Sequence, residues 1–144
     1  MARIQLDLPE RFTYRTEVTL RVSDMNYAGH MGNDTVMSLL HEARSRLLKE
    51  NGCEGQKIEG LGLVVADAVV IYKAQAHYAD VMVIEMTARD FNRYGCDLVY
   101  RISNRDTAAE IARAKTGIVF FNYDQGRVNG VPERFFELIG VRPE

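Results

Sequence analysis

The sequence lacks several features that define large classes of proteins. It has no run of about 20 apolar residues, the length that a membrane-spanning helix needs, so we expect no membrane partner. Its 18 Lys and Arg residues against 20 Asp and Glu residues give a formal net charge of -2, and the basic residues are scattered along the chain. We therefore expect no nucleic-acid partner, because proteins that bind nucleic acids concentrate positive charge on one surface.

Cysteine is also scarce, since Cys53 and Cys96 are the only two in 144 residues. Their spacing fits neither a CxxC site nor a disulfide framework, and the N-terminus lacks the apolar segment of a secretory signal, so we expect free thiols in the cytoplasm. No His, Cys or Asp cluster has the spacing of metal ligands, and no glycine-rich phosphate loop follows a strand. The sequence thus predicts no metal and no cofactor. Its length is typical of one domain, which we expect to span residues 1–144.

Two periodic segments begin the chain. In residues 12–22 the even positions are mostly apolar and the odd positions polar, which predicts a half-buried strand. In residues 34–50 apolar side chains recur at intervals of three and four, which predicts one long helix. Asn33 or Asp34 can cap its start, and Asn51-Gly52 can end it.

The chain after Gly60 predicts four strands, at 61–73, 81–91, 96–103 and 110–123, joined by short turns in an antiparallel meander. The first is apolar on both faces apart from Asp67, which is typical of a central strand covered on both sides. Residues 131–140 predict one short helical turn. Because one helix cannot cover both faces of such a sheet, we expect the sheet to wrap around the helix.

This order of elements resembles the hotdog fold, an α+β fold in which a five-stranded antiparallel sheet is wrapped around one long central helix. The resemblance implies a homodimer or a homotetramer, because members of the fold generally pair their sheets edge to edge.

Residues 23–44, "SDMNYAGHMGNDTVMSLLHEAR", carry a closer resemblance. They are similar to the signature of the 4-hydroxybenzoyl-CoA thioesterase-like acyl-CoA thioesterases, D-x-D-x-x-G-H-V-N-N followed by E-A-R. The matching positions are Asp24, Gly29, His30, Met31, Asn33, Glu42, Ala43 and Arg44. The resemblance implies that the chain hydrolyses an acyl-CoA or acyl-carrier-protein thioester, with coenzyme A entering only as part of the substrate.

One position departs from this signature. The family has its nucleophile or base at the second acidic residue of D-x-D, where this chain has Asn26. An amide cannot act as a base, but it can orient water or bind the thioester carbonyl. Other hotdog thioesterases pair such an amide with a carboxylate of the central helix, often across the dimer interface. Glu42 and Asp24 are the catalytic candidates, whereas we expect Asp34 to stabilise the first turn of the helix.

The remaining site residues follow from the same loop. His30 can either fix the turn or contact the thioester or a water molecule, and both roles remain open. The glycines permit a tight turn in which main-chain N–H groups bind the carbonyl oxygen, as in an oxyanion hole. The predicted substrate-binding residues are Tyr27, Gly29, Met31, Gly32 and Asn33, with Lys73 and Arg93 as contacts for the phosphates of coenzyme A.

Two other functions remain open. The chain could be a hydratase or dehydratase that acts on an acyl thioester with His30 as its base. It could also be a non-catalytic acyl-thioester-binding protein, since the expected aspartate is replaced by Asn26.

Overall fold

The computed structural model describes residues 2–144, which form one seven-stranded antiparallel sheet and two α-helices. The long helix is α1 (Asn33–Glu50), and the short helix α2 (Glu133–Ile139) lies near the C-terminus. Single turns of 3-10 helix occur at Val22–Asp24 and Glu54–Gln56. The strands are β1 (Tyr14–Thr19), β2 (Lys57–Ile58), β3 (Leu61–Tyr72), β4 (Val81–Arg89), β5 (Gly95–Asn104), β6 (Glu110–Asn122) and β7 (Arg127–Asn129).

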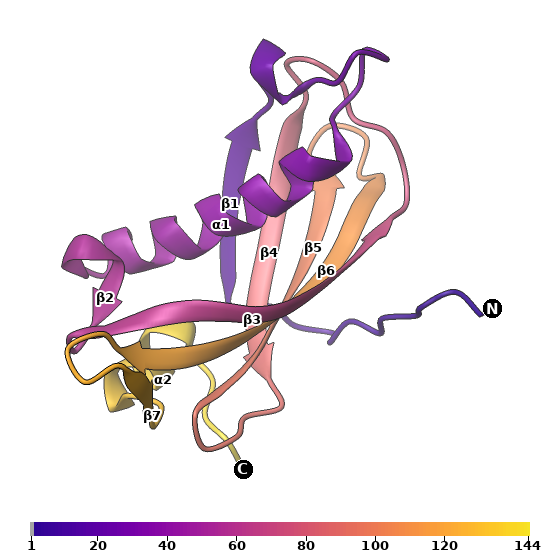
Figure 1. The fold of residues 1–144 in the computed structure, drawn as a ribbon. Helices are drawn as coiled ribbons and strands as arrows, with labels where there is room; N and C mark the ends of the chain where they lie inside the picture. The colour runs from indigo at the N-terminus through magenta and orange to yellow at the C-terminus, as the bar shows by residue number, and fades with distance from the viewer. Residues whose placement is uncertain (1) are drawn as a thin grey trace.

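The sheet is curled, and α1 lies across one of its faces (Figure 1). The strand order is β1-β4-β5-β6-β3-β2, with β7 beside the end of β6. This arrangement confirms the α+β hotdog fold. The sheet has seven strands rather than five because β2 and β7, of two and three residues, add short pairings to the ends of β3 and β6.

The core of the fold is the contact between α1 and the inner face of the sheet. The buried helix positions recur at the spacing of one helical face: Thr35, Val36, Leu39, Leu40, Ala43, Leu47 and Leu48. The predicted helix is therefore confirmed to within one residue, and Asn51-Gly52 ends it, with Gly52 at φ +76. The N-cap is Gly32 rather than Asn33 or Asp34.

The path of β3 differs from the prediction. The predicted meander is correct for β4, β5 and β6. β3 does not pair with β4, however, but with β6. The connection at 73–80 leads the chain from β3 to β4, which lies between β1 and β5 in the sheet. Beyond Leu61 and Gly62, which pair with β2, one edge of β3 has no partner strand in residues 2–144. Val65, Ala66 and Ala68 are exposed. The prediction of a central strand covered on both faces is therefore wrong.

The first strand is also shorter than predicted, at 14–19 rather than 12–22. Leu20 still exchanges main-chain hydrogen bonds with Ala79 and Asp80, the residues just before β4. The chain leaves the ladder at Arg21, whose N–H donates to the side chain of Asp24.

A buried polar chain links α1 to the inner face of the sheet. Arg44 donates to the hydroxyl of Tyr100 at 3.1 Å, and that hydroxyl lies 2.6 Å from the hydroxyl of Thr116. Tyr100 is fully buried, and its burial raises the pKa of the phenol.

Both cysteines are free, and burial raises the pKa of the Cys96 thiol to about 12.

Removing the Tyr100 hydroxyl should therefore destabilise the fold. We expect Tyr100→Phe to lower the free energy of unfolding by about 1–3 kcal/mol, because Arg44 and Thr116 each lose a partner in a buried site. Urea denaturation measures the change. The control Tyr94→Phe, at the surface, should change stability by less than about 0.5 kcal/mol. Equal effects of the two variants would show that the buried chain contributes nothing.

Candidate active site

Asp24 connects the end of β1 to the start of α1. Its carboxylate accepts the Arg21 N–H at 2.7 Å, and its main-chain carbonyl accepts the Gly32 N–H at 3.1 Å and the Thr35 hydroxyl at 3.0 Å. The residue is buried, with 8% of its surface exposed. The carboxylate therefore has a structural partner and points to Arg21, away from the side on which Asn26 lies.

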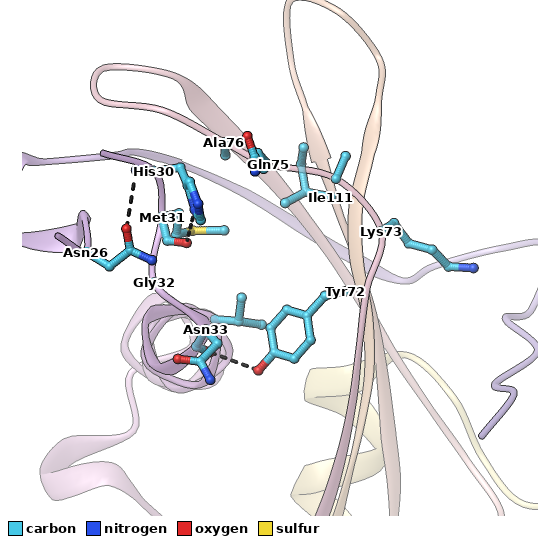
Figure 2. Close-up of a pocket in the computed structure, with 12 residues that line it drawn as sticks. Asn26, His30, Met31, Gly32, Asn33, Tyr72, Lys73, Gln75, Ala76 and Ile111 are labelled. Carbon is cyan, nitrogen blue, oxygen red and sulfur yellow. Dashed lines mark hydrogen bonds between the residues drawn. The ribbon is translucent and has the colours of Figure 1, made fainter. Parts of the chain in front are cut away.

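Asn26 closes the following turn with its side chain. Its Oδ1 accepts the N–H of Ala28 at 2.9 Å and that of His30 at 3.5 Å, and its own main chain bonds to His30 and to Gly29. Gly29 has φ +86, the conformation predicted for this turn. Because Oδ1 is used within the loop, Nδ2 remains as the group that can bind a ligand, and Nδ2 is a donor (Figure 2).

The main-chain donors differ from those predicted. The N–H groups of Gly29 and Gly32 both bond to carbonyls within the loop, and Gly32 has φ -68. Gly32 is needed instead for space, since a Cβ there would lie 2.5 Å from Oδ1 of Asp34. At the start of α1, the N–H groups of Asn33 and Asp34 have no hydrogen-bond partner in residues 2–144, because the helix has no side-chain cap. They lie at the positive end of the helix dipole.

A cavity of about 370 Å³ opens beside this helix start (Figure 2). Its floor is made of buried apolar side chains, namely Met31, Val36, Ala76 and Ile111. The rest of its lining is Asn26, His30, Gly32, Asn33, Tyr72, Lys73, Ala74 and Gln75. Two main-chain contacts hold its walls together: the N–H of Met31 bonds to the carbonyl of Ala76, and the N–H of Lys73 bonds to that of Ile111. The result is a small space with an apolar floor and polar groups on several of its sides.

The cavity brings together six of the predicted site residues: Asn26, His30, Met31, Gly32, Asn33 and Lys73. The amine of Lys73 points away from the space (Figure 2). Tyr27 and Gly29 are exposed and do not line it. Arg93 lies in the turn between β4 and β5, with its guanidinium over the ring of Tyr94.

Neither predicted carboxylate lies in this cavity. Glu42 and Asp24 line a second cavity of about 290 Å³, in which Glu42 accepts a hydrogen bond from Arg46 at 2.8 Å. Arg46 is itself fixed by Thr16 and by the carbonyl of Glu17. No Asp or Glu is among the residues that line the first cavity, so a single chain does not bring Asn26 and these carboxylates together. Their catalytic roles stay predictions.

The part of the site that comes from β3, from the connection after it and from β6 was not predicted. Tyr72, Gln75 and Ile111 are far from the loop in sequence, and no motif marks them. The structure brings them to the helix start because the connection after β3 passes over the beginning of β6. Among the described residues, no group of three or more His, Cys, Asp or Glu side chains is placed to hold a metal ion, and neither helix is long and apolar enough to cross a membrane.

Comparisons with known proteins agree with this geometry. A family profile, the thioesterase-like superfamily, matches residues 20–139. Among solved structures, Slr0204, a 1,4-dihydroxy-2-naphthoyl-CoA thioesterase from Synechocystis, is 21% identical, with a TM-score of 0.79 over 90% of this chain and 98% of its own. The PA2801 protein of Pseudomonas aeruginosa is 20% identical, with a TM-score of 0.81 over 90% and 99%.

A third structure is a 4-hydroxybenzoyl-CoA thioesterase with an aspartate-to-asparagine substitution, complexed with 4-hydroxybenzoyl-CoA. It is 20% identical, with a TM-score of 0.75 over 88% of this chain and 97% of its own. No curated protein matches the sequence. At these identities the structures establish the shared fold, and the profile establishes the family: the chain belongs to the thioesterase-like superfamily. Membership of this superfamily supports the enzyme class of the thioester hydrolases.

The turn around Asn26 gives a test of the assigned amide geometry. We expect Asn26→Asp to leave the free energy of unfolding within about 0.5 kcal/mol, because a carboxylate accepts the same two N–H groups. Asn26→Ala should lower it by about 0.5–1.5 kcal/mol for each bond lost. Thermal unfolding measures both, with Asn33→Ala as the control for loss of an amide that the loop does not use. A destabilised Asn26→Asp variant would mean that Nδ2, rather than Oδ1, faces the loop.

Proposed function

We propose that the chain hydrolyses an acyl-CoA thioester in the cavity beside the start of α1. Water adds to the thioester carbonyl, the oxyanion forms, and the C–S bond then breaks to give the free acid and the thiol of coenzyme A. The observation that carries this proposal is that two donors without a partner, the Asn33 N–H and Nδ2 of Asn26, belong to residues that line a cavity with an apolar floor. Such donors stabilise the negative charge that develops in the transition state.

Two donors that line the cavity fill this role in the proposal. The N–H of Asn33 points out of the helix start, and the side chain of Asn26, whose Nδ2 the loop does not use, lies beside Gly32, the residue before it. The substitution of the family's acidic residue by Asn26 therefore exchanges a base for a second donor. No metal or organic cofactor enters the reaction.

Water activation requires a base from outside this set. We assign it to Glu42 of another copy. Because Glu42 lies on the β1 side of α1, that copy must contact this chain through a surface other than the β3 edge. Asp24 is the less favoured candidate because its carboxylate is buried and accepts the Arg21 N–H, whereas Glu42 is exposed. His30 lines the cavity, with its Nδ1 3.4 Å from the carbonyl of Met31, and is the group on the same chain that could accept the proton.

The two edges of the sheet support a dimer built on β3. The β1 edge carries Arg15 and Glu17, whose charges disfavour pairing with another strand. The β3 edge instead presents Val65, Ala66 and Ala68, which are exposed although apolar or small, and its one charged residue in this stretch, Asp67, is paired with Lys115. Antiparallel pairing of two β3 edges about a two-fold axis would cover them and extend the sheet through both chains.

We expect light scattering to give the mass of a dimer or a tetramer at micromolar concentration. Val65→Lys should reduce the mass, because a charge on this edge opposes pairing. Thr19→Lys, which adds the same charge to the β1 edge, should leave it unchanged. A monomeric wild-type protein, or equal effects of the two substitutions, would exclude the β3 interface.

The catalytic assignment predicts a graded loss of activity. Asn26→Ala should lower thiol release by one or two orders of magnitude, because losing one well-placed hydrogen bond costs ~1.4 to 3 kcal/mol in the transition state. Glu42→Gln should abolish most of the activity. The control Asp34→Asn should retain activity and lose about 1 kcal/mol of stability or less, since it removes only a first-turn charge.

Mixing the two inactive variants tests whether the site is shared between chains. Random exchange of Asn26→Ala and Glu42→Gln subunits should restore about a quarter of the wild-type activity, because half of the dimers are mixed and each has one intact site. No recovery would place both residues in one chain or remove Glu42 from the mechanism.

A panel of acyl-CoA substrates distinguishes the proposal from its alternatives. Free thiol released from at least one thioester supports hydrolysis. Hydration of an enoyl-CoA without thiol release would instead support the hydratase, in which His30 acts as the base. Binding of acyl-CoA with neither reaction would support the non-catalytic binding protein.

A further inference from the structure

Tyr72 spans the gap between the sheet and α1. It is the last residue of β3, and its hydroxyl donates to the main-chain carbonyl of Asn33 at 3.0 Å. Figure 2 shows the ring beside the open space, with Met31 and Ile111 across from it. The side chain is 53% exposed, so one part of the ring lines the cavity while the rest meets solvent. The ring is therefore a thin wall between the cavity and the outside.

The position of this wall relative to the reacting carbonyl is defined by one residue. Asn33 offers its N–H to the oxyanion and its carbonyl to Tyr72. In an α-helix the N–H groups point towards the N-terminus and the carbonyls towards the C-terminus. The ring of Tyr72 thus lies further along the helix than the oxyanion donors, on the side where Val36 and Ile111 provide an apolar floor for an acyl group.

We propose that Tyr72 is the residue that limits the acyl group to a small one, a short aliphatic chain or a single aromatic ring. This inference rests on the proposed function and adds its substrate class. The cavity volume of about 370 Å³ is near the lower end of the roughly 300–1,000 Å³ found for ligand sites. With the ring in place, the acyl chain meets Tyr72. Without it, the space opens past the end of β3.

The hydroxyl and the ring of Tyr72 make separable contributions to the limit on acyl-group size. The hydrogen bond to Asn33 holds the ring across the gap, and the side chain has no other hydrogen-bond partner in residues 2–144. Tyr72→Phe removes only this bond and keeps the volume of the wall. Tyr72→Ala removes both. Comparing the two variants therefore separates two effects: the ring blocks the acyl chain, and the hydroxyl holds the ring in position.

The experiment compares kcat/KM for acetyl-, butyryl-, octanoyl-, dodecanoyl- and benzoyl-CoA, measured as free thiol release. We expect the wild-type protein to favour the short and aromatic acyl groups. Tyr72→Ala should raise the ratio of octanoyl to butyryl by about tenfold or more, since single methylenes in an apolar pocket already change kcat/KM by roughly 10–200-fold. Tyr72→Phe should raise it less. The control Tyr78→Ala, an exposed tyrosine outside the cavity, should leave the ratio unchanged.

Two results would overturn the inference: a wild-type enzyme that favours dodecanoyl-CoA, or a Tyr72→Ala enzyme with the wild-type ratio. Dissociation constants of non-hydrolysable acyl-CoA thioethers, measured by calorimetry, give the same ratio without catalysis. A shifted binding ratio in a protein that hydrolyses none of the thioesters would refute the proposed function and retain Tyr72 as the selective residue. If Tyr72→Ala does not fold, Tyr72→Leu replaces it and must show the same direction of change.

Discussion

The structure depends on the burial of one face of α1 against the curled sheet. Leu40 and Ala43 are completely buried there, and each strand from β3 to β6 contributes apolar side chains to the same core. Burial of a Leu-sized side chain contributes about 1.5–3 kcal/mol, so the helix face is a large part of the stability of a chain of this size. Because the helix is fixed along its length, its first turn is fixed as well. That first turn supplies the donors of the candidate site.

The loop before α1 uses its polar residues for two different purposes. Asp24 and the oxygen of Asn26 satisfy main-chain N–H groups within the loop, so they determine its shape. The groups that remain on the cavity side, Nδ2 of Asn26 and the N–H of Asn33, are those that we propose to bind the substrate. The same short segment is therefore rich in polar residues because it must both hold its own backbone and present donors to a substrate.

The sequence predicted the parts of the structure that depend on local pattern. The helix at 33–50 and the strands β4 to β6 follow from periodicity, and the loop motif located the helix-start end of the cavity. The position of β3 was not predictable in this way. A strand that is apolar on both faces has the same sequence pattern whether its chain buries it or leaves it at an edge of the sheet. Val65 and Ala68 of β3 are exposed at such an edge. Tyr72 and Ile111 were missed for the related reason that only the sheet topology brings them to the loop. The direction of the Asp24 carboxylate, towards Arg21, was also not predictable, because it depends on a 3-10 turn at Val22–Asp24 that periodicity does not reveal.

The strand order also has a consequence for how the chain folds. β1 is made first, yet its pairing partner is β4, with Tyr14 opposite Met86 and Thr19 opposite Val81. During synthesis, β1 and α1 emerge before any strand to which they can attach, and closing such a long loop has an entropic cost that local contacts do not offset. The helix can form early as a local element, whereas the ladder of β1 must wait until β4 has left the ribosome. The exposed interval lasts longer still, because β3 pairs with β6, and the nascent chain therefore stays prone to aggregation through the apolar face of α1 and the unpaired β3 until β6 is complete.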